Sequence, residues 1–84
     1  MTTLTVKTLK GKETDSNPTF RWTVEFQPGD NMGHFGDPDG WTVKTLKSGI
    51  RKVSQTIWGS PGETQAEFTN RMREFVTGMG VKLA

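Results

Sequence analysis

The chain has 84 residues, which corresponds to one domain, residues 1–84, near the lower size limit for folding around a single core. It contains no cysteine, which excludes a disulfide framework, a thiolate metal site and a cysteine nucleophile. Its formal net charge of +2 is smaller than that of most strong polyanion binders.

The N-terminal residues Met1-Thr2-Thr3-Leu4 have neither the basic nor the apolar part of a signal peptide. No stretch approaches the roughly 20 apolar residues that a membrane span requires. We therefore expect a cytoplasmic protein with no membrane partner, which agrees with the lack of cysteine.

Two strands are predicted in the first third of the chain. Residues 2–10 are rich in Thr, Leu and Val and end at a Lys-Gly pair, which is typical of a strand and its turn. Residues 11–18 are polar and predict a loop. Large apolar residues then alternate with polar ones and predict a half-buried strand: Phe20, Trp22, Val24 and Phe26.

The stretch 41–58 admits two interpretations. As a helix, it would place five apolar residues at heptad spacing: Val43, Leu46, Ile50, Val53 and Ile57. The lack of Ala and Glu, the many β-branched residues and the central Gly49 favour strands instead. The hexamer Thr-Val-Lys-Thr-Leu-Lys decides the matter, since it occurs at 5–10, in a predicted strand, and again at 42–47.

We therefore predict strands at 41–47 and 50–58. The loop Lys47-Ser48-Gly49 joins them as a three-residue hairpin connection, with glycine at the position that needs a positive φ. This register places Lys44 opposite Lys52.

A helix is predicted after residue 60. The segment Ser60-Pro61-Gly62-Glu63 has the composition of a capping box, with Ser60 as the N-cap and Pro61 as the first helical residue. One apolar stripe follows at helical spacing: Phe68, Met72, Phe75 and Met79. Glycines end the helix, and we expect the tail 81–84 to be frayed.

These elements predict an α+β fold, a four-stranded and mainly antiparallel sheet with one C-terminal helix packed on one face. The covered face should hold Leu4, Val6, Phe20, Trp22, Val24, Phe26, Trp41, Val43, Val53 and Ile57. The strand order stays open, but the terminal strand 2–10 is expected at an edge. Because only Lys7 and Lys10 protect that edge, we expect a homodimer formed by edge pairing or by the exposed sheet faces.

The uncovered sheet face is predicted to carry hydroxyl and basic side chains. The candidate nucleic-acid contacts are Lys7, Arg21, Thr23, Lys44, Lys52, Ser54 and Thr56. Lys and Arg suit phosphates, and hydroxyls reach phosphates or base edges. The like-charged Lys44–Lys52 pair is mildly destabilising, and an anion lying across it would relieve the repulsion. The leading hypothesis is a non-enzymatic DNA-binding module; the alternative is an ordinary solvent-facing sheet surface.

Residues 19–77 resemble in topology the sheet-plus-helix DNA-binding domains of arm-type integrases and plant ethylene-response factors. The resemblance is carried by the turn Asp37-Pro38-Asp39-Gly40, by Trp58-Gly59 and by the helix from Pro61, and it implies a sheet inserted into the major groove. These features are not specific and the run of basic residues is thinner here, so the chain is assigned to neither family. Val53-Ser54-Gln55-Thr56-Ile57 also resembles the start of a helix-turn-helix recognition helix, but Lys52 stands where a small residue is needed.

The loop 28–40 supports a second function hypothesis. Met32, His34 and Phe35 lie there among glycines and acidic residues. Exposed Met and Phe side chains with an acidic rim would form a protein-binding anchor, as in small inhibitors or adaptors of phage or mobile-element type. The alternative that Phe35 folds back onto the core edge stays open.

Metal binding and catalysis are not expected. His34, the single histidine, is near Asp30, Asp37 and Asp39 in sequence, and Asp37-x-Asp39-Gly40 matches a fragment of a calcium loop. The bidentate Glu of that loop is absent, which favours a plain turn, and we expect no cofactor. The chain also lacks tyrosine and a glycine-rich phosphate motif, so we do not expect an enzyme.

Overall fold

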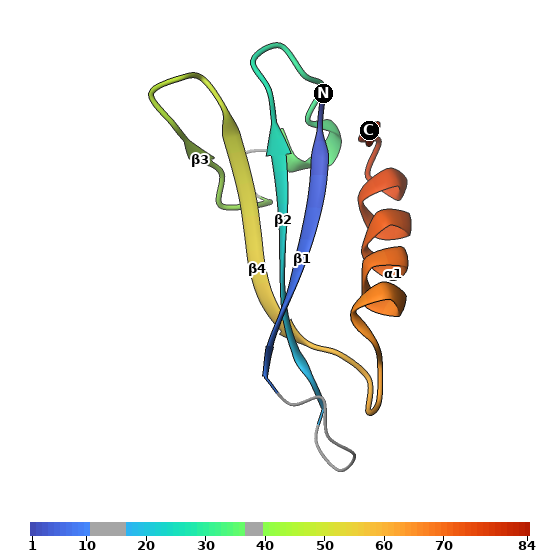
Figure 1. Ribbon diagram of the computed structural model, residues 1–84. Coiled ribbons are helices and arrows are strands. Elements are labelled where there is room, and N and C mark those ends of the chain that lie inside the picture. Colours follow the sequence, from blue (N-terminus) through green and yellow to red (C-terminus); the bar gives the residue numbers. More distant parts are fainter. Residues whose placement is uncertain (11–16, 37–39) are drawn as a thin grey trace.

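The computed structural model describes residues 1–10, 17–36 and 40–84 (Figure 1). In chain order, the elements are β1 (Thr3–Lys10), β2 (Thr19–Phe26), the short 3-10 helix η1 (Gly33–Gly36), β3 (Lys44–Thr45), β4 (Arg51–Trp58) and α1 (Gln65–Gly78). The Asp37-Pro38-Asp39 part of the predicted turn lies outside the described residues. No helix within the described ranges is long and apolar enough to cross a membrane.

The predicted fold class is confirmed. The four strands form one antiparallel sheet in the order β1-β2-β4-β3, and α1 runs along the β1 and β2 side of it (Figure 1). β2 takes a central position because it alternates large apolar with polar residues. The side chains of Phe20, Trp22, Val24 and Phe26 are each at most 1% exposed.

The predicted hairpin is confirmed at its turn and is shorter in its first strand. Gly49 has a φ of 89°, and its N–H donates to the Leu46 carbonyl at 2.9 Å. The Leu46 N–H donates to the Ile50 carbonyl at 2.8 Å, so the turn has the type I plus glycine geometry of three-residue loops. β3 keeps only two residues of the predicted 41–47 strand, although Lys44 does lie opposite Lys52.

An aromatic cluster explains the shortening of β3. The rings of Trp22, Phe35, Trp41 and Phe75 all contact one another, with centroids 5.2 to 6.5 Å apart. Trp41 turns its ring into this cluster, so the chain before Lys44 leaves the path that would pair it with β4. The same hexamer is therefore fully extended in β1 and only partly so in β3, because packing overrides local preference.

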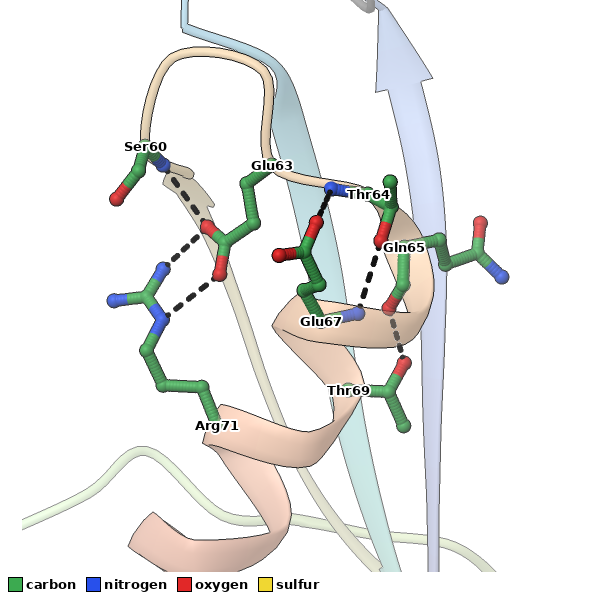
Figure 2. Close-up of polar contacts among 7 residues, drawn as sticks. All are labelled: Ser60, Glu63, Thr64, Gln65, Glu67, Thr69 and Arg71. Carbon is green, nitrogen blue, oxygen red and sulfur yellow. Dashed lines mark hydrogen bonds and ion pairs between the residues drawn. The ribbon is translucent and has the colours of Figure 1, made fainter.

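The prediction for the start of α1 was wrong by one turn. The N-cap is Thr64, whose Oγ1 accepts from the Glu67 N–H at 3.2 Å, while a Glu67 carboxylate oxygen accepts from the Thr64 N–H at 3.0 Å (Figure 2). The sequence contains two Ser/Thr-x-x-Glu patterns in succession, and Gly62 decides between them. Its φ of 76° is incompatible with a helix and instead suits a type II turn after Pro61.

The first of these patterns, Ser60 to Glu63, forms the turn that precedes α1 and is linked to the helix by an ion pair. The Glu63 N–H donates to the Ser60 carbonyl at 2.9 Å, and the Glu63 carboxylate accepts from the Ser60 N–H at 2.9 Å (Figure 2). The same carboxylate pairs with Arg71 at 2.8 Å, which ties the turn to the second turn of α1.

The helix buries a stripe that differs from the predicted one at its C-terminal end. Phe68, Met72 and Val76 are buried, with Phe68 stacked on Phe20 at 4.3 Å between ring centroids. Phe75 is 40% exposed and contributes the edge of its ring to the aromatic cluster. The buried residues are spaced i, i+4, i+8, so they form a narrow stripe along the side of the helix that faces the sheet.

The C-terminal tail was predicted to be frayed, and this was wrong. Val81 is 1% exposed, Leu83 forms a parallel bridge with Thr2, and the Ala84 N–H donates to the Thr2 carbonyl at 2.9 Å. The tail thus lies against the outer side of β1, which is an edge strand as expected. At the other end of β1, the Thr8 N–H donates to Oε1 of Gln65 at 3.2 Å.

Candidate nucleic-acid interface

The open face of the sheet is the side opposite α1. Phe20 points toward the helix, so the odd-numbered residues of β2 point away from it, and the cross-strand register carries this alternation to the other strands. Every residue predicted to contact nucleic acid lies on this open face: Lys7, Arg21, Thr23, Lys44, Lys52, Ser54 and Thr56. Glu25 lies on it as well.

A shallow hollow of about 390 Å³ occupies the middle of the open face. Residues of all four strands line it, and they are of two chemical kinds. The cations are Lys7, Arg21, Lys44 and Lys52, and the hydroxyl residues are Thr5, Thr23, Thr42 and Ser54. Cations and hydroxyls are the side chains that bind phosphate in proteins.

The central hydroxyls form a chain of hydrogen bonds. The Ser54 hydroxyl donates to the Trp22 carbonyl at 3.2 Å, and the Thr23 and Ser54 hydroxyl oxygens are 3.1 Å apart. Because the single Ser54 proton is used on Trp22, Thr23 is the donor of this second bond. Both hydroxyls therefore offer only acceptor lone pairs to a ligand, which suits a base N–H better than a phosphate oxygen.

Arg21 is held in position and keeps donors free. Its Nε donates to Thr56 Oγ1 across the strands at 3.2 Å. This bond uses one N–H and leaves the terminal guanidinium nitrogens available for a phosphate. Lys7 lies directly opposite Arg21 on β1, so two cations lie side by side at this end of the hollow.

The predicted Lys44–Lys52 pair is present, but a protein carboxylate already relieves its repulsion. Glu25 lies opposite Lys52 on β2, and their charged groups are 3.6 Å apart. Lys44 has no ion pair within the described parts of the chain. The repulsion therefore needs no external anion, which corrects one reason for expecting nucleic acid here, and Lys44 is the more available of the two cations.

The loop residues predicted as protein-binding anchors are not presented to solvent. Phe35 is 1% exposed and Met32 is 9% exposed, so the expected exposed anchor is wrong. Phe35 enters the aromatic cluster, which is the fold-back that the sequence left open. His34 is exposed on η1, where its backbone N–H donates to the Met79 carbonyl at 2.9 Å, at the end of α1 and away from the open face.

Trp58 is an open-face residue that sequence reasoning missed. It follows Thr56 by two positions in β4 and lies opposite Thr19, so it belongs to the open face. Its side chain is 76% exposed, whereas Trp22 is 1% exposed. Period-two alternation from Ser54 and Thr56 is the signal that could have found it.

The carboxyl groups with shifted pKa values lie away from the open face. The Gln27 N–H and then the Thr2 hydroxyl donate to Asp30 at 2.8 and 2.9 Å, and these bonds lower the pKa of Asp30. The Thr64 backbone N–H, followed by the Thr64 side chain, lowers the pKa of Glu67. Within the described ranges, no three His, Cys, Asp or Glu residues gather as a metal site, and Asp37 and Asp39 lie outside those ranges.

No protein-family model matches the chain, and neither does any curated protein or solved structure. The function is therefore inferred from the residues of the open face.

Proposed function

We propose that the protein is a small non-enzymatic module that binds DNA through the open face of its sheet. One observation carries the proposal: four cations, one from each strand, gather around a single shallow hollow on the face that α1 leaves bare. An excess of positive charge on one face attracts a polyanion even when the net charge of the protein is small. Here the formal net charge is only +2.

In this proposal the open-face residues have different roles, which their hydrogen bonds support. Lys7, Arg21 and Lys44 contact phosphates, because each has N–H donors that no described residue uses. Thr56 orients Arg21 rather than meeting the ligand itself. Thr23 and Ser54 accept from the amino groups of bases, since their own protons are committed within the sheet.

The test is the salt dependence of DNA binding, measured by fluorescence anisotropy with labelled oligonucleotides. The Lys44→Glu/Lys52→Glu double variant should bind more weakly. Its log–log salt slope should fall by about 1 unit for loss of the Lys44 contact, or by about 2 units if Lys52 also leaves Glu25 for a phosphate, since each phosphate contact contributes about 0.9. The control is Arg73→Glu/Lys82→Glu, on α1 and in the C-terminal tail, outside the hollow. Circular dichroism should first show that it stays folded, because Arg73 donates to the Ala84 carbonyl. Both variants change the net charge from +2 to −2, because two cations become two anions. Equal losses in the two variants, or no loss in the first, would overturn the proposal.

Glu25→Gln provides a test in the opposite direction. It removes the carboxylate that holds Lys52 at 3.6 Å and leaves a side chain of similar size. If phosphate competes with Glu25 for Lys52, the variant should bind DNA more tightly and with a steeper salt slope. Unchanged affinity would remove Lys52 from the contact set.

The second candidate is a protein-binding inhibitor or adaptor that acts through residues 28–40. The side chains of Met32 and Phe35, which were expected to anchor a partner, are buried in the core and are not exposed for binding. A tagged pull-down with and without nuclease still separates the candidates. Partners lost on nuclease treatment support the DNA-binding proposal, and protein partners that survive it support the adaptor.

A further inference from the structure

Trp58 is the most exposed aromatic side chain that the structure describes, and its position is unusual. An indole that is 76% exposed leaves a large apolar surface in water, although burial of such a ring normally stabilises a small domain. Within the described residues its ring contacts no other aromatic ring, whereas the rings of Trp22 and Trp41 meet edge to face. The cost of this exposure is offset if the ring face receives a ligand.

The neighbours of Trp58 are the cations and hydroxyls of the open face. Thr56 lies two residues away on β4, about 7 Å along the strand, and its hydroxyl holds Arg21. Lys7 lies beyond Arg21 on β1. From Trp58 to Lys52 the open-face positions of β4 extend over six residue steps, or about 20 Å. A flat apolar platform thus stands at one end of a row of phosphate-binding groups.

This arrangement suits a single strand better than a duplex. In a duplex, each base is stacked between its neighbours and offers a protein only its edges in the grooves. A single strand can place the face of an unstacked base on an aromatic ring while its phosphates follow a basic surface. The indole of Trp58 has a free face, which a base edge in a groove would not use.

The hydroxyl chain argues for DNA over RNA. A protein that selects RNA needs groups free to bond the 2′-hydroxyl, which is both donor and acceptor. On the open face, the protons of Thr23 and Ser54 are used within the sheet, and Thr56 accepts from Arg21. At the centre of the hollow, the Thr23 and Ser54 hydroxyls therefore have no free proton to donate to a ribose 2′-hydroxyl.

We propose that the ligand of the open face is single-stranded DNA, with one base stacked on Trp58 and the following phosphates on Arg21, Lys7 and Lys44. This inference rests on the proposed function and names the form of DNA that the face takes. It makes Trp58 a binding residue and predicts a preference for unpaired DNA over the corresponding duplex.

The experiment compares wild-type protein with Trp58→Ala and Trp58→Phe by anisotropy. The probes are a labelled mixed-sequence DNA of about 12 nucleotides, within the range that small single-strand binders cover, its duplex, and the RNA of the same sequence. Trp58→Ala should weaken binding to single-stranded DNA by about 5- to 150-fold, the range found for loss of one stacked base. Trp58→Phe should recover most of the affinity, and neither variant should change the salt slope. Because Trp58 is exposed, circular dichroism should show unchanged folding.

The outcomes separate the two proposals. If the duplex binds as well as the single strand and Trp58→Ala changes neither, the stacking inference is overturned while DNA binding stands. A preference for RNA overturns the choice of DNA. If no probe binds and Lys44→Glu/Lys52→Glu has no effect, both proposals fall together.

Discussion

Replacing Thr64 with alanine removes one half of the capping box at the start of α1. The lost bond joins Thr64 Oγ1 to the Glu67 N–H over 3.2 Å at an exposed helix end, where water can take its place. N-cap replacements of this kind cost about 0.5 to 2 kcal/mol, and the long, exposed bond places Thr64→Ala near about 1 kcal/mol. For a domain of this size, that loss lowers the melting temperature by roughly 4 to 8 °C.

The matched control is Ser60→Ala, at the N-cap expected from sequence. Ser60 uses its backbone N–H and carbonyl in the turn, and alanine keeps both, so the loss should be below about 0.5 kcal/mol. Thr64→Ser retains the hydroxyl and should restore most of the stability. Thermal and urea unfolding followed by circular dichroism measure all three variants. If Ser60→Ala proves the more damaging change, α1 begins one turn earlier and the argument from Gly62 fails.

Three further predictions concern the core, one ionisable group and one glycine. Phe68→Ala should lower the free energy of unfolding by about 3 to 5 kcal/mol, because the ring is fully buried, and urea unfolding should show this loss at constant m-value. The hydrogen bonds to Asp30 lower its pKa in the folded state, so the ionised carboxylate stabilises the fold above its ordinary pKa. This stabilisation is lost as the pH falls below about 4. Asp30→Ala should therefore flatten the dependence of unfolding free energy on pH below about 4. Gly33→Ala should cost more than Gly29→Ala, since both have positive φ but only the first would meet the Met79 carbonyl oxygen, and equal losses by thermal unfolding would contradict this contact.

The local sequence pattern was sufficient to predict the sheet and the turn between β3 and β4. The alternation in β2 identified its buried side chains, and the repeated hexamer led to the correct pairing of Lys44 with Lys52. Both signals are periodic, and period two is a direct property of strand geometry. The composition of the open face followed from the same rule.

Long-range packing accounts for what could not be predicted. Whether Phe35 turns inward depends on Trp22 and Phe75, which are distant in sequence and reach it only in the folded chain. The open-face position of Trp58 follows from the alternation of β4, but its exposure also requires that the helix cover the other face. Nothing packs on the open face in the described structure, and a count of aromatic residues cannot show which side of the sheet the helix will cover.

The two contacts on the outer side of β1 have a consequence for self-association. In an antiparallel ladder, alternate residues direct their backbone groups outward, so the outward groups of β1 belong to the even-numbered residues. The tail donates to the Thr2 carbonyl, and Gln65 accepts from the Thr8 N–H. In the described part of β1, the outward groups left for a neighbouring chain are those of Leu4 and Val6 and the Thr8 carbonyl. A homodimer, still a prediction, would therefore have at β1 a pairing edge of Leu4 to Thr8, interrupted at the Thr8 N–H and shorter than the strand itself. The C-terminal tail and Gln65 thus protect the edge strand β1 without a proline. Loss of the C-terminal residues would expose further backbone groups of β1 and favour pairing with strands of other chains.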